Sequence, residues 1–169
     1  HSFSFFFENA SIVYFFILYL RIQILKFLIK VSRLIHISEA ASLAIHSLAL
    51  IASSGIKLNA KQIAEILHVS QNHLAKILQV LAKNEYLESN RGPGGGFVMK
   101  KNAGEITMLE IYQLIEGNVE CRLCGISDSS CPFLTCIFGG KPDKLTLEFV
   151  EYLDKTKISD LKTKDIKYA

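Results

Sequence analysis

The spacing of apolar residues changes at about Leu34, and this change divides the chain into two parts of different character. From Leu34 to Ala52, leucine, isoleucine and alanine recur at steps of three and four residues, which predicts an amphipathic helix. Gly55 follows the last of these positions and is expected to end the helix. We therefore expect the folded domain to begin near Leu34.

Two shorter helices are expected next, separated by a tight turn. Asn59 and Gln62 have the spacing of a capping box, which opens a short helix. Ser70 is suited to cap a second helix that extends to about Lys83 and carries its leucines and isoleucine on one face. Two helices joined by about three residues form a helix-turn-helix.

A β-hairpin is predicted directly after the helix pair. Residues 86–88 and 97–99 are suited to two strands, and the segment between them contains Arg91, Gly92, Pro93 and three further glycines. Glycines allow the backbone to approach another surface closely. An arginine at such a tip is suited to a narrow minor groove of DNA, where the negative potential is enhanced.

Two further helices are expected in the last third of the chain. Thr107 and Glu110 have the spacing of a second capping box, and Gly117 is expected to end the helix that it opens. Pro142 precedes a late helix with an apolar face at heptad-like steps, which is typical of a dimer seam. The lysine-rich tail after residue 155 is expected to be frayed. The apolar positions of the late helix are Leu145, Phe149 and Tyr152, with Val150 and Leu153 beside them.

These elements predict a mainly α-helical fold with a small β-hairpin wing, that is, a winged helix-turn-helix followed by a long dimerisation helix. We expect four segments along the chain. Residues 1–33 form an apolar leader, and residues 34–104 form the DNA-binding domain. Residues 105–140 contain a connecting helix and a cysteine loop, and residues 141–169 contain the dimerisation helix and a tail.

The leader contains an uninterrupted apolar run only from Ile12 to Leu20. A membrane span needs about twenty apolar residues, and extending the run that far would bury Arg21. Basic residues follow the run instead of preceding it, which argues against a cleaved signal peptide. We expect the leader not to belong to the native protein, with a membrane anchor or a packed helix as alternatives. We expect a cytoplasmic protein without a membrane partner.

The position of the charges is more informative than their total. A formal net charge of +3 is too small to indicate a nucleic-acid partner by itself. Cations nevertheless cluster on the helix pair and the hairpin, at Lys76, Lys83, Arg91, Lys100 and Lys101. This footprint predicts binding of double-stranded DNA through polar and basic side chains of the second helix and the wing tip. The candidate residues are Ser70, Gln71, Asn72, His73, Lys76, Arg91, Gly92, Pro93 and Gly94.

All four cysteines fall within sixteen residues, in the pattern Cys121-x2-Cys124-x6-Cys131-x4-Cys136. Disulfides need an oxidising compartment, which a DNA-binding chain does not normally occupy. Structural zinc sites usually contain two close Cys-x2-Cys pairs, and this sequence has one. Iron-sulfur clusters accept irregular loop spacings. The spacing therefore favours a cluster over zinc, and a thiol redox switch is the third interpretation.

Together these motifs resemble the Rrf2 family of bacterial winged-helix regulators. The resemblance covers residues 34–161 and is carried by ISEAASLAIH at residues 37–46, the wing RGPGGGF at residues 91–97, and the cysteine loop after the capping-box helix. It implies a homodimer, a recognition helix that begins at Ser70, and a wing arginine at Arg91 that enters the minor groove.

The resemblance also implies a cluster held by Cys124, Cys131 and Cys136, with Cys121 as an additional candidate for the fourth ligand. Other members of the family take a fourth ligand from a histidine or from a carboxylate on the first helix of the partner subunit. Here no histidine follows Cys136, and Ser42 stands at the position that we align with the carboxylate. Both a 2Fe-2S and a 4Fe-4S cluster therefore stay open.

We interpret the chain as a transcription regulator whose operator affinity is controlled by an iron-sulfur cluster that senses iron, redox or nitric oxide status. The first alternative is a zinc-bound or thiol-switch repressor of the same fold. The second is a membrane-tethered protein-interaction adaptor. We do not expect an enzyme, because no nucleophile with a base, carboxylate pair or cofactor loop stands out in the sequence.

Overall fold

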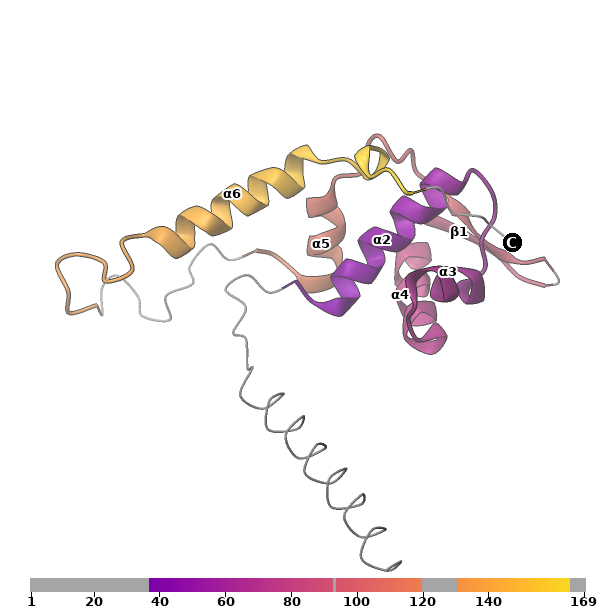
Figure 1. Cartoon of the computed structure of the whole chain (residues 1–169), viewed down its shortest axis with the longest axis horizontal. Helices are drawn as coiled ribbons and strands as arrows, with labels where there is room; N and C mark the ends of the chain where they lie inside the picture. The colour runs from indigo at the N-terminus through magenta and orange to yellow at the C-terminus, as the bar shows by residue number, and fades with distance from the viewer. Residues whose placement is uncertain (1–36, 93, 120–130, 165–169) are drawn as a thin grey trace, which may run out of the picture. The chain divides into compact units, whose positions relative to one another are not determined.

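The computed structural model describes residues 37–92, 94–119 and 131–164 (Figure 1). Its mainly helical architecture with a small β-hairpin confirms the predicted fold class. The expected leader, residues 1–33, lies outside the described residues. The elements in chain order are α2 (Glu39–Ser54), α3 (Ala60–Leu67), α4 (Gln71–Lys83), β1 (Leu87–Asn90), β2 (Gly96–Met99), α5 (Met108–Glu116), α6 (Lys141–Lys155) and the 3-10 helix η1 (Ile158–Asp160).

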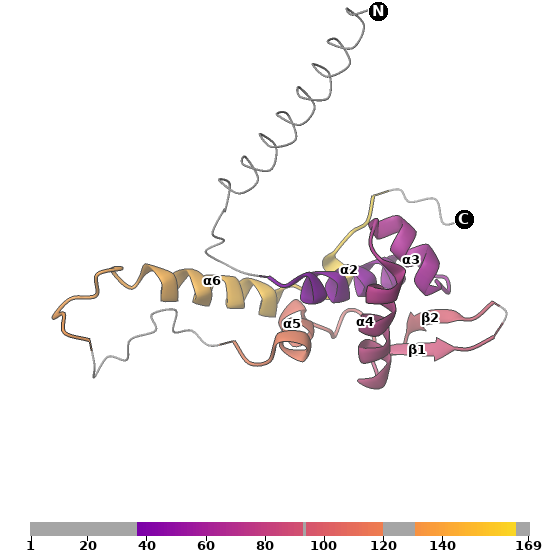
Figure 2. The ribbon, with the colours of Figure 1, turned by 90° about the horizontal axis from the view of Figure 1, so that it is seen from below.

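Helix α2 is the centre of the core, and it begins later than the apolar spacing predicts. Its first residue is Glu39, because the Ser38 hydroxyl accepts a hydrogen bond from the Ala41 amide at 3.0 Å and caps the helix. Gly55 ends the helix in a left-handed conformation (φ 64°), as predicted. Helix α2 packs against α4, α5 and the hairpin, and these elements surround it in Figures 1 and 2.

The helix pair that follows α2 forms as predicted. The Asn59 side chain accepts a hydrogen bond from the Gln62 amide at 2.9 Å, and the Gln62 side chain accepts one from the Asn59 amide at 3.0 Å, which confirms the capping box. Ser70 occupies the N-cap position of α4, but contrary to expectation its side chain makes no capping hydrogen bond. The buried face of α4 consists of the predicted residues Leu74, Ile77, Leu78 and Leu81.

The hairpin is antiparallel and pairs Leu87 with Met99 and Asn90 with Gly96. A third backbone segment joins it, which the sequence did not reveal. Phe97 donates a hydrogen bond to the Leu58 carbonyl at 2.8 Å and accepts one from the Leu58 amide at 3.2 Å. The wing is therefore fastened to the chain just before α3 and is held in place relative to the helix pair.

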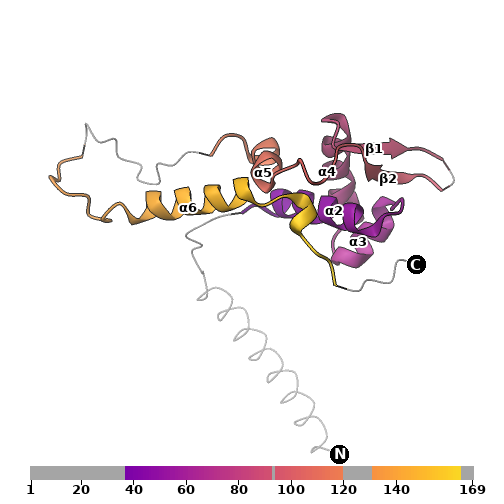
Figure 3. The same ribbon diagram turned by 90° about the horizontal axis from the view of Figure 1, so that it is seen from above.

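Helix α6 begins at Lys141, so Pro142 lies in its first turn and not before it. The chain after the helix returns to the domain, as Figure 3 shows. Met108 donates to the Thr156 carbonyl and Ile158 to the Ile106 carbonyl, both at 2.9 Å. Ile158 is 1 % exposed. The expectation of a frayed tail is therefore wrong for residues 156–161, because a buried apolar side chain and backbone hydrogen bonds hold them against α5.

One polar side chain of α2 is buried without compensation. Ser47 is completely buried, and its hydroxyl has no hydrogen-bond partner among the residues that the structure describes. Since a buried unsatisfied hydroxyl carries a desolvation penalty, we expect Ser47→Ala to raise the free energy of unfolding by about 1 kcal/mol. Ser54→Ala is the matched control, because the Ser54 hydroxyl lies 2.9 Å from the Ile51 carbonyl to which it donates. Urea unfolding that finds Ser47→Ala the more destabilising of the two would contradict this.

Candidate nucleic-acid interface and cysteine loop

The first turns of α4 present the predicted polar side chains on the surface. Ser70, Gln71, Asn72 and Lys76 are all exposed. They stand on the side of α4 opposite its buried leucines, because the apolar residues recur at three- and four-residue steps. The turn before them is tight, since His68 adopts a left-handed conformation (φ 54°) at the end of α3. This geometry leaves the start of α4 free to enter a groove of DNA.

His73 lies partly exposed on the same helix, and the structure gives it an additional role. Its Nδ1 atom lies 3.7 Å from Oε1 of Glu39, in the first turn of α2. The neighbouring Ser38 hydroxyl donates a hydrogen bond to the Glu116 carboxylate at the end of α5. The start of α2 therefore contacts both the recognition helix and the helix that precedes the cysteine loop.

The wing tip exposes Arg91, Gly92 and Gly94, whereas Pro93 lies outside the described residues. Gly92 and Gly94 have φ values of 99° and 75°, which favour glycine. The next two glycines serve a different purpose from the expected approach to another surface. A Cβ atom at Gly95 would lie 2.4 Å from the Asn90 carbonyl oxygen, and one at Gly96 would lie 2.7 Å from the Leu58 carbonyl oxygen. These two glycines let the wing pack against its own chain.

Because of this close packing, position 96 has no room for even the methyl side chain of alanine. We expect Gly96→Ala to lower the free energy of unfolding by about 2 kcal/mol, because the new Cβ meets a backbone oxygen that cannot move away easily. Gly104→Ala is the control, since its nearest contact is the Asn102 side chain at 3.4 Å. Equal unfolding midpoints for the two variants would show that the bridge between Leu58 and Phe97 does not hold the wing.

The cations of the predicted footprint fall into two groups. Lys100 forms an ion pair with Glu85, and Lys101 lies 3.7 Å from Oε1 of Glu110 and 4.0 Å from the centre of the Tyr86 ring. These two lysines are therefore engaged within the protein and are poorer candidates for phosphate contacts than the sequence suggests. In contrast, Lys76, Lys83 and Arg91 have no ion pair among the residues described here. Their charges stay available to an external polyanion.

Tyr86 and Glu110 form a partly buried link between the wing and α5 that sequence reasoning missed. The Tyr86 hydroxyl donates a hydrogen bond to Oε1 of Glu110 at 2.6 Å. Burial, followed by this hydrogen bond to a carboxylate, raises the pKa of Tyr86 far above its usual value, so the hydroxyl stays a donor at physiological pH. Thr107 caps α5 as predicted, accepting from the Glu110 amide at 3.0 Å. The Glu110 carboxylate, however, accepts the hydrogen bond from the Tyr86 hydroxyl, instead of the one from the Thr107 amide that a capping box would have.

The cysteine loop is described only in its second half. Cys131 is partly exposed and Cys136 is exposed, and both are free thiols, whereas Cys121 and Cys124 lie outside the described residues. The Cys136 carbonyl accepts a hydrogen bond from the Gly139 amide at 2.9 Å, in a turn that leads into α6. Among the described residues there is no group of three metal-ligating side chains. Accessible, reduced thiols are the donors that an iron-sulfur cluster or zinc requires, so these two residues fit either group.

Exposed apolar residues neighbour the two cysteines in the sequence of this loop. Phe133, Leu134, Ile137 and Phe138 are all exposed, and Leu134 is fully so.

The position that we align with a partner carboxylate is Ser42, whose hydroxyl oxygen lies 3.4 Å from Nδ1 of His46. It therefore offers a hydroxyl, which is a weaker ligand than a carboxylate.

Helices α3 and α4 with the adjoining hairpin make this a winged helix-turn-helix protein. The profile of the Rrf2 family, described as iron-dependent transcriptional regulators, matches residues 37–164. The chain therefore belongs to the Rrf2 family, whose members are transcriptional regulators and not enzymes. The resemblance in the sequence is thus confirmed.

Individual relatives share parts of the chain. The putative transcriptional regulator BadM of Rhodopseudomonas palustris is 41% identical over 69 residues, which cover 41% of this chain and 44% of BadM. The regulator NsrR of Bacillus subtilis is 30% identical over 61% of this chain and 72% of its own length. The regulator IscR of Cronobacter sakazakii is 34% identical over 37% of this chain and 38% of its own. The matches to BadM and IscR thus span less than half of each relative.

Solved structures share the fold. CymR, the global cysteine regulator of B. subtilis, has a TM-score of 0.61 at 20% identity, and the match covers 75% of this chain and 95% of that one. T. potens IscR has a TM-score of 0.57 at 21% identity, over 75% of this chain and 85% of that one. At these sequence identities the structural similarity shows only that the fold is shared. Within the part of the chain that the structure describes, no helix is both long and apolar enough to cross a bilayer.

Proposed function

We propose that this transcriptional regulator binds a pseudo-palindromic operator through α4 and the wing, as a homodimer in the cytoplasm. The observation that carries the proposal is the exposed polar start of α4 next to a wing whose Arg91 has no ion pair among the described residues. Gln71 and Asn72 are suited to base edges in the major groove, and Lys76 is suited to the phosphate backbone. Gly92, Pro93 and Gly94 bring the Arg91 guanidinium to the minor groove.

The second part of the proposal concerns the signal. An iron-sulfur cluster, 2Fe-2S or 4Fe-4S, would be held by Cys124, Cys131 and Cys136, with Cys121 as the candidate fourth ligand. When bound, such a cluster supplies a centre that responds to iron supply, oxidation or nitric oxide. Support comes from the family description, which names iron dependence, and from the free thiols of Cys131 and Cys136.

The contacts at the start of α2 provide a route from the cysteine loop to the DNA. The loop directly follows α5, whose last residue, Glu116, accepts the hydrogen bond from Ser38. Glu39, the next residue, lies beside His73 on α4. Ligation of a cluster by the loop thiols would shift the end of α5, and these contacts would pass the shift to the recognition helix. The operator then fits one state better than the other.

Dimerisation is assigned to the first part of α6. Leu145, Leu147 and Tyr152 are exposed on this helix, although they are apolar or aromatic. Leu153, which the sequence also suggests for the seam, is only 2 % exposed, because the end of α6 packs against its own domain at α5. We therefore propose that residues 141–152 meet a second copy, while the end of the helix anchors α6. Residues 34–104 then form the DNA-binding part, and residues 105–140 connect it to the dimer.

The alternative regulator uses zinc or thiol oxidation in place of a cluster. The exposed thiol of Cys136 favours it, because an accessible cysteine reacts readily with oxidants. Metal and sulfide analysis distinguishes these forms of the protein. A cluster-bound protein contains both iron and sulfide, a zinc-bound protein contains zinc without iron or sulfide, and a thiol-switch protein contains no metal.

Selection from a library of random double-stranded DNA tests the proposed DNA binding. We expect the full chain to enrich a two-fold symmetric sequence whose half-sites lie about one helical turn apart. Affinity for the enriched sequence is expected to fall steeply as salt rises, because phosphate contacts release counterions. A library that stays unenriched after repeated rounds, under both aerobic and anaerobic conditions, would refute operator binding.

A further inference from the structure

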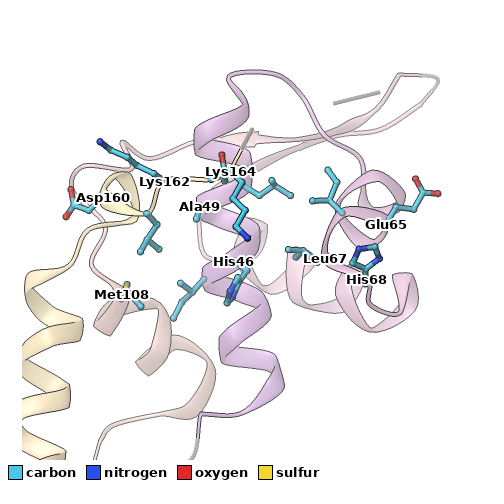
Figure 4. Close-up of a pocket in the computed structure, with 14 residues that line it drawn as sticks. His46, Ala49, Glu65, Leu67, His68, Met108, Asp160, Lys162 and Lys164 are labelled. Atoms are coloured by element: carbon cyan, nitrogen blue, oxygen red, sulfur yellow. The ribbon is translucent and has the colours of Figure 1, made fainter. Parts of the chain in front are cut away.

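A groove of about 930 Å³ lies beside α2, and no part of the proposed function uses it (Figure 4). It is bounded by α2, by the end of α3, by the first residue of α5 and by the segment that follows η1. Its size is that of a pocket for a small organic ligand. Its apolar lining comes from Ile45, Ala49, Leu50, Ile66, Leu67, Met108 and Leu161.

The charged side chains at this groove are arranged asymmetrically. Figure 4 shows the Lys164 side chain reaching inward towards the His46 ring, while the carboxylates of Glu65 and Asp160 point away from the centre. Both carboxylates also have partners: Glu65 lies 3.9 Å from Lys61, and Asp160 accepts a hydrogen bond from the Lys157 amide at 2.9 Å. The groove therefore offers a cation and no inward-facing anion.

His46 adds a second polar group to the interior of the groove. Its Nδ1 atom lies 2.7 Å from the Ser42 carbonyl oxygen, which can only accept, so Nδ1 carries a proton. The other ring nitrogen, Nε2, then carries the lone pair of the neutral ring and can only accept a hydrogen bond from a ligand. An apolar lining with a few convergent polar groups is the usual composition of a site for an organic molecule. Here the Lys164 ammonium is the group complementary to a negative headgroup.

The groove also reaches the helix-turn-helix itself. His68 lines it and is the C-cap residue directly after α3, two residues before the cap of α4. Its φ of 54° is unusual for a residue that is not glycine. Backbone strain of this kind is common where a segment clamps a ligand or changes conformation. A molecule in the groove thus contacts the turn that sets the position of the recognition helix.

We propose that this groove binds a small monocarboxylate with an apolar body, with its carboxylate at Lys164 and its apolar part between α2 and α3. Binding at His68 then changes operator affinity independently of the cysteine loop; this last step rests on the proposed DNA-binding function. The site gives the regulator a second input, separate from the cysteine loop.

Calorimetric titration of the full chain with octanoate tests the site, with octan-1-ol as the uncharged probe of similar length. We expect octanoate to bind more tightly than octan-1-ol. Lys164→Glu is expected to weaken octanoate binding by about tenfold, the loss expected for one charge-assisted hydrogen bond. Lys57→Glu is the matched control, since it makes the same change of charge at an exposed residue between α2 and α3 that does not line the groove. We expect that variant to bind octanoate as the unchanged chain does.

Three results would overturn the proposal. The first is that the full chain does not bind octanoate, as when a second copy or another segment fills the groove. The second is that octan-1-ol binds as tightly as octanoate, and the third is that both lysine variants lose the same octanoate affinity. None of them involves DNA, so each would leave the proposed operator binding untouched. Conversely, octanoate binding that depends on Lys164, together with an unenriched DNA library, would support the site and refute the regulator function.

Discussion

Arg91→Ala is expected to weaken binding to the selected operator by about tenfold, within the range of 1–3 kcal/mol typical of a specific arginine contact. Arg91 is exposed at the wing tip and has no ion pair among the described residues, so its charge is not already neutralised within the protein. Gly92 and Gly94, both with positive φ, lie at the tip beside it. We also expect the dependence of log affinity on log salt to lose about one unit of slope.

Lys162→Ala is the control for this change, because it removes one exposed positive charge from the segment after η1, outside the wing, α4 and the proposed dimer seam. A general charge effect would weaken binding in both variants, whereas a wing contact weakens it only in Arg91→Ala. Fluorescence anisotropy at several salt concentrations measures both quantities. Operator affinity that is unchanged in Arg91→Ala would remove the wing from the interface and leave only α4.

Cys131→Ala is expected to abolish the visible absorption and the bound iron of protein purified without oxygen. The proposed cluster depends on this thiolate, and an alanine offers no ligand in its place. Cys136→Ala is expected to have the same effect. Loss of the cluster in either variant is expected to change operator affinity to that of the iron-free protein.

Thr135→Ala is the matched control, since Thr135 is exposed on the same loop and lies between the two cysteines. It is expected to retain full absorption. Colour that survives intact in Cys131→Ala would refute the ligand role of that residue. Equal colour loss in Thr135→Ala would show that the loop is sensitive to any change and would leave the ligands unidentified.

The features that the sequence predicts well are those determined locally. The Asn59 and Gln62 capping box needs residues only three apart, and it appears as predicted. The buried face of α4 follows from helical spacing alone. The glycine at the end of α2 likewise acts within its own turn. Such features are predictable because the hydrogen bonds and periodicities that create them lie within a single segment.

The features that the sequence does not predict depend on segments that meet only in the fold. Tyr86 and Glu110 are 24 residues apart, yet their hydrogen bond redirects the carboxylate expected in a capping box. The pairing of Leu58 with Phe97 adds a backbone segment to the hairpin in the same way. Lys100 and Lys101 look available in the sequence but have acidic partners in the structure.

The same limit applies to the candidate site. The sequence indicates an exposed polar start for α4, and the structure bears this out for Ser70, Gln71, Asn72 and Lys76. The sequence gives no sign that His73 lies beside Glu39, because α3 stands between α2 and α4 along the chain. The groove beside α2 that contains Lys164 is formed by four separate segments, so no sequence motif marks it.

The central claim is that loss or gain of an iron-sulfur cluster changes operator affinity, and one paired measurement tests it. The full chain is purified without oxygen, its spectrum and its iron, sulfide and zinc contents are recorded, and its affinity for the selected operator is measured before and after iron removal. We predict broad visible absorption, matching iron and sulfide, and an affinity that changes by about tenfold or more on iron removal and returns on reconstitution. Colourless protein with stoichiometric zinc, or an affinity that does not respond to iron removal, would contradict the account.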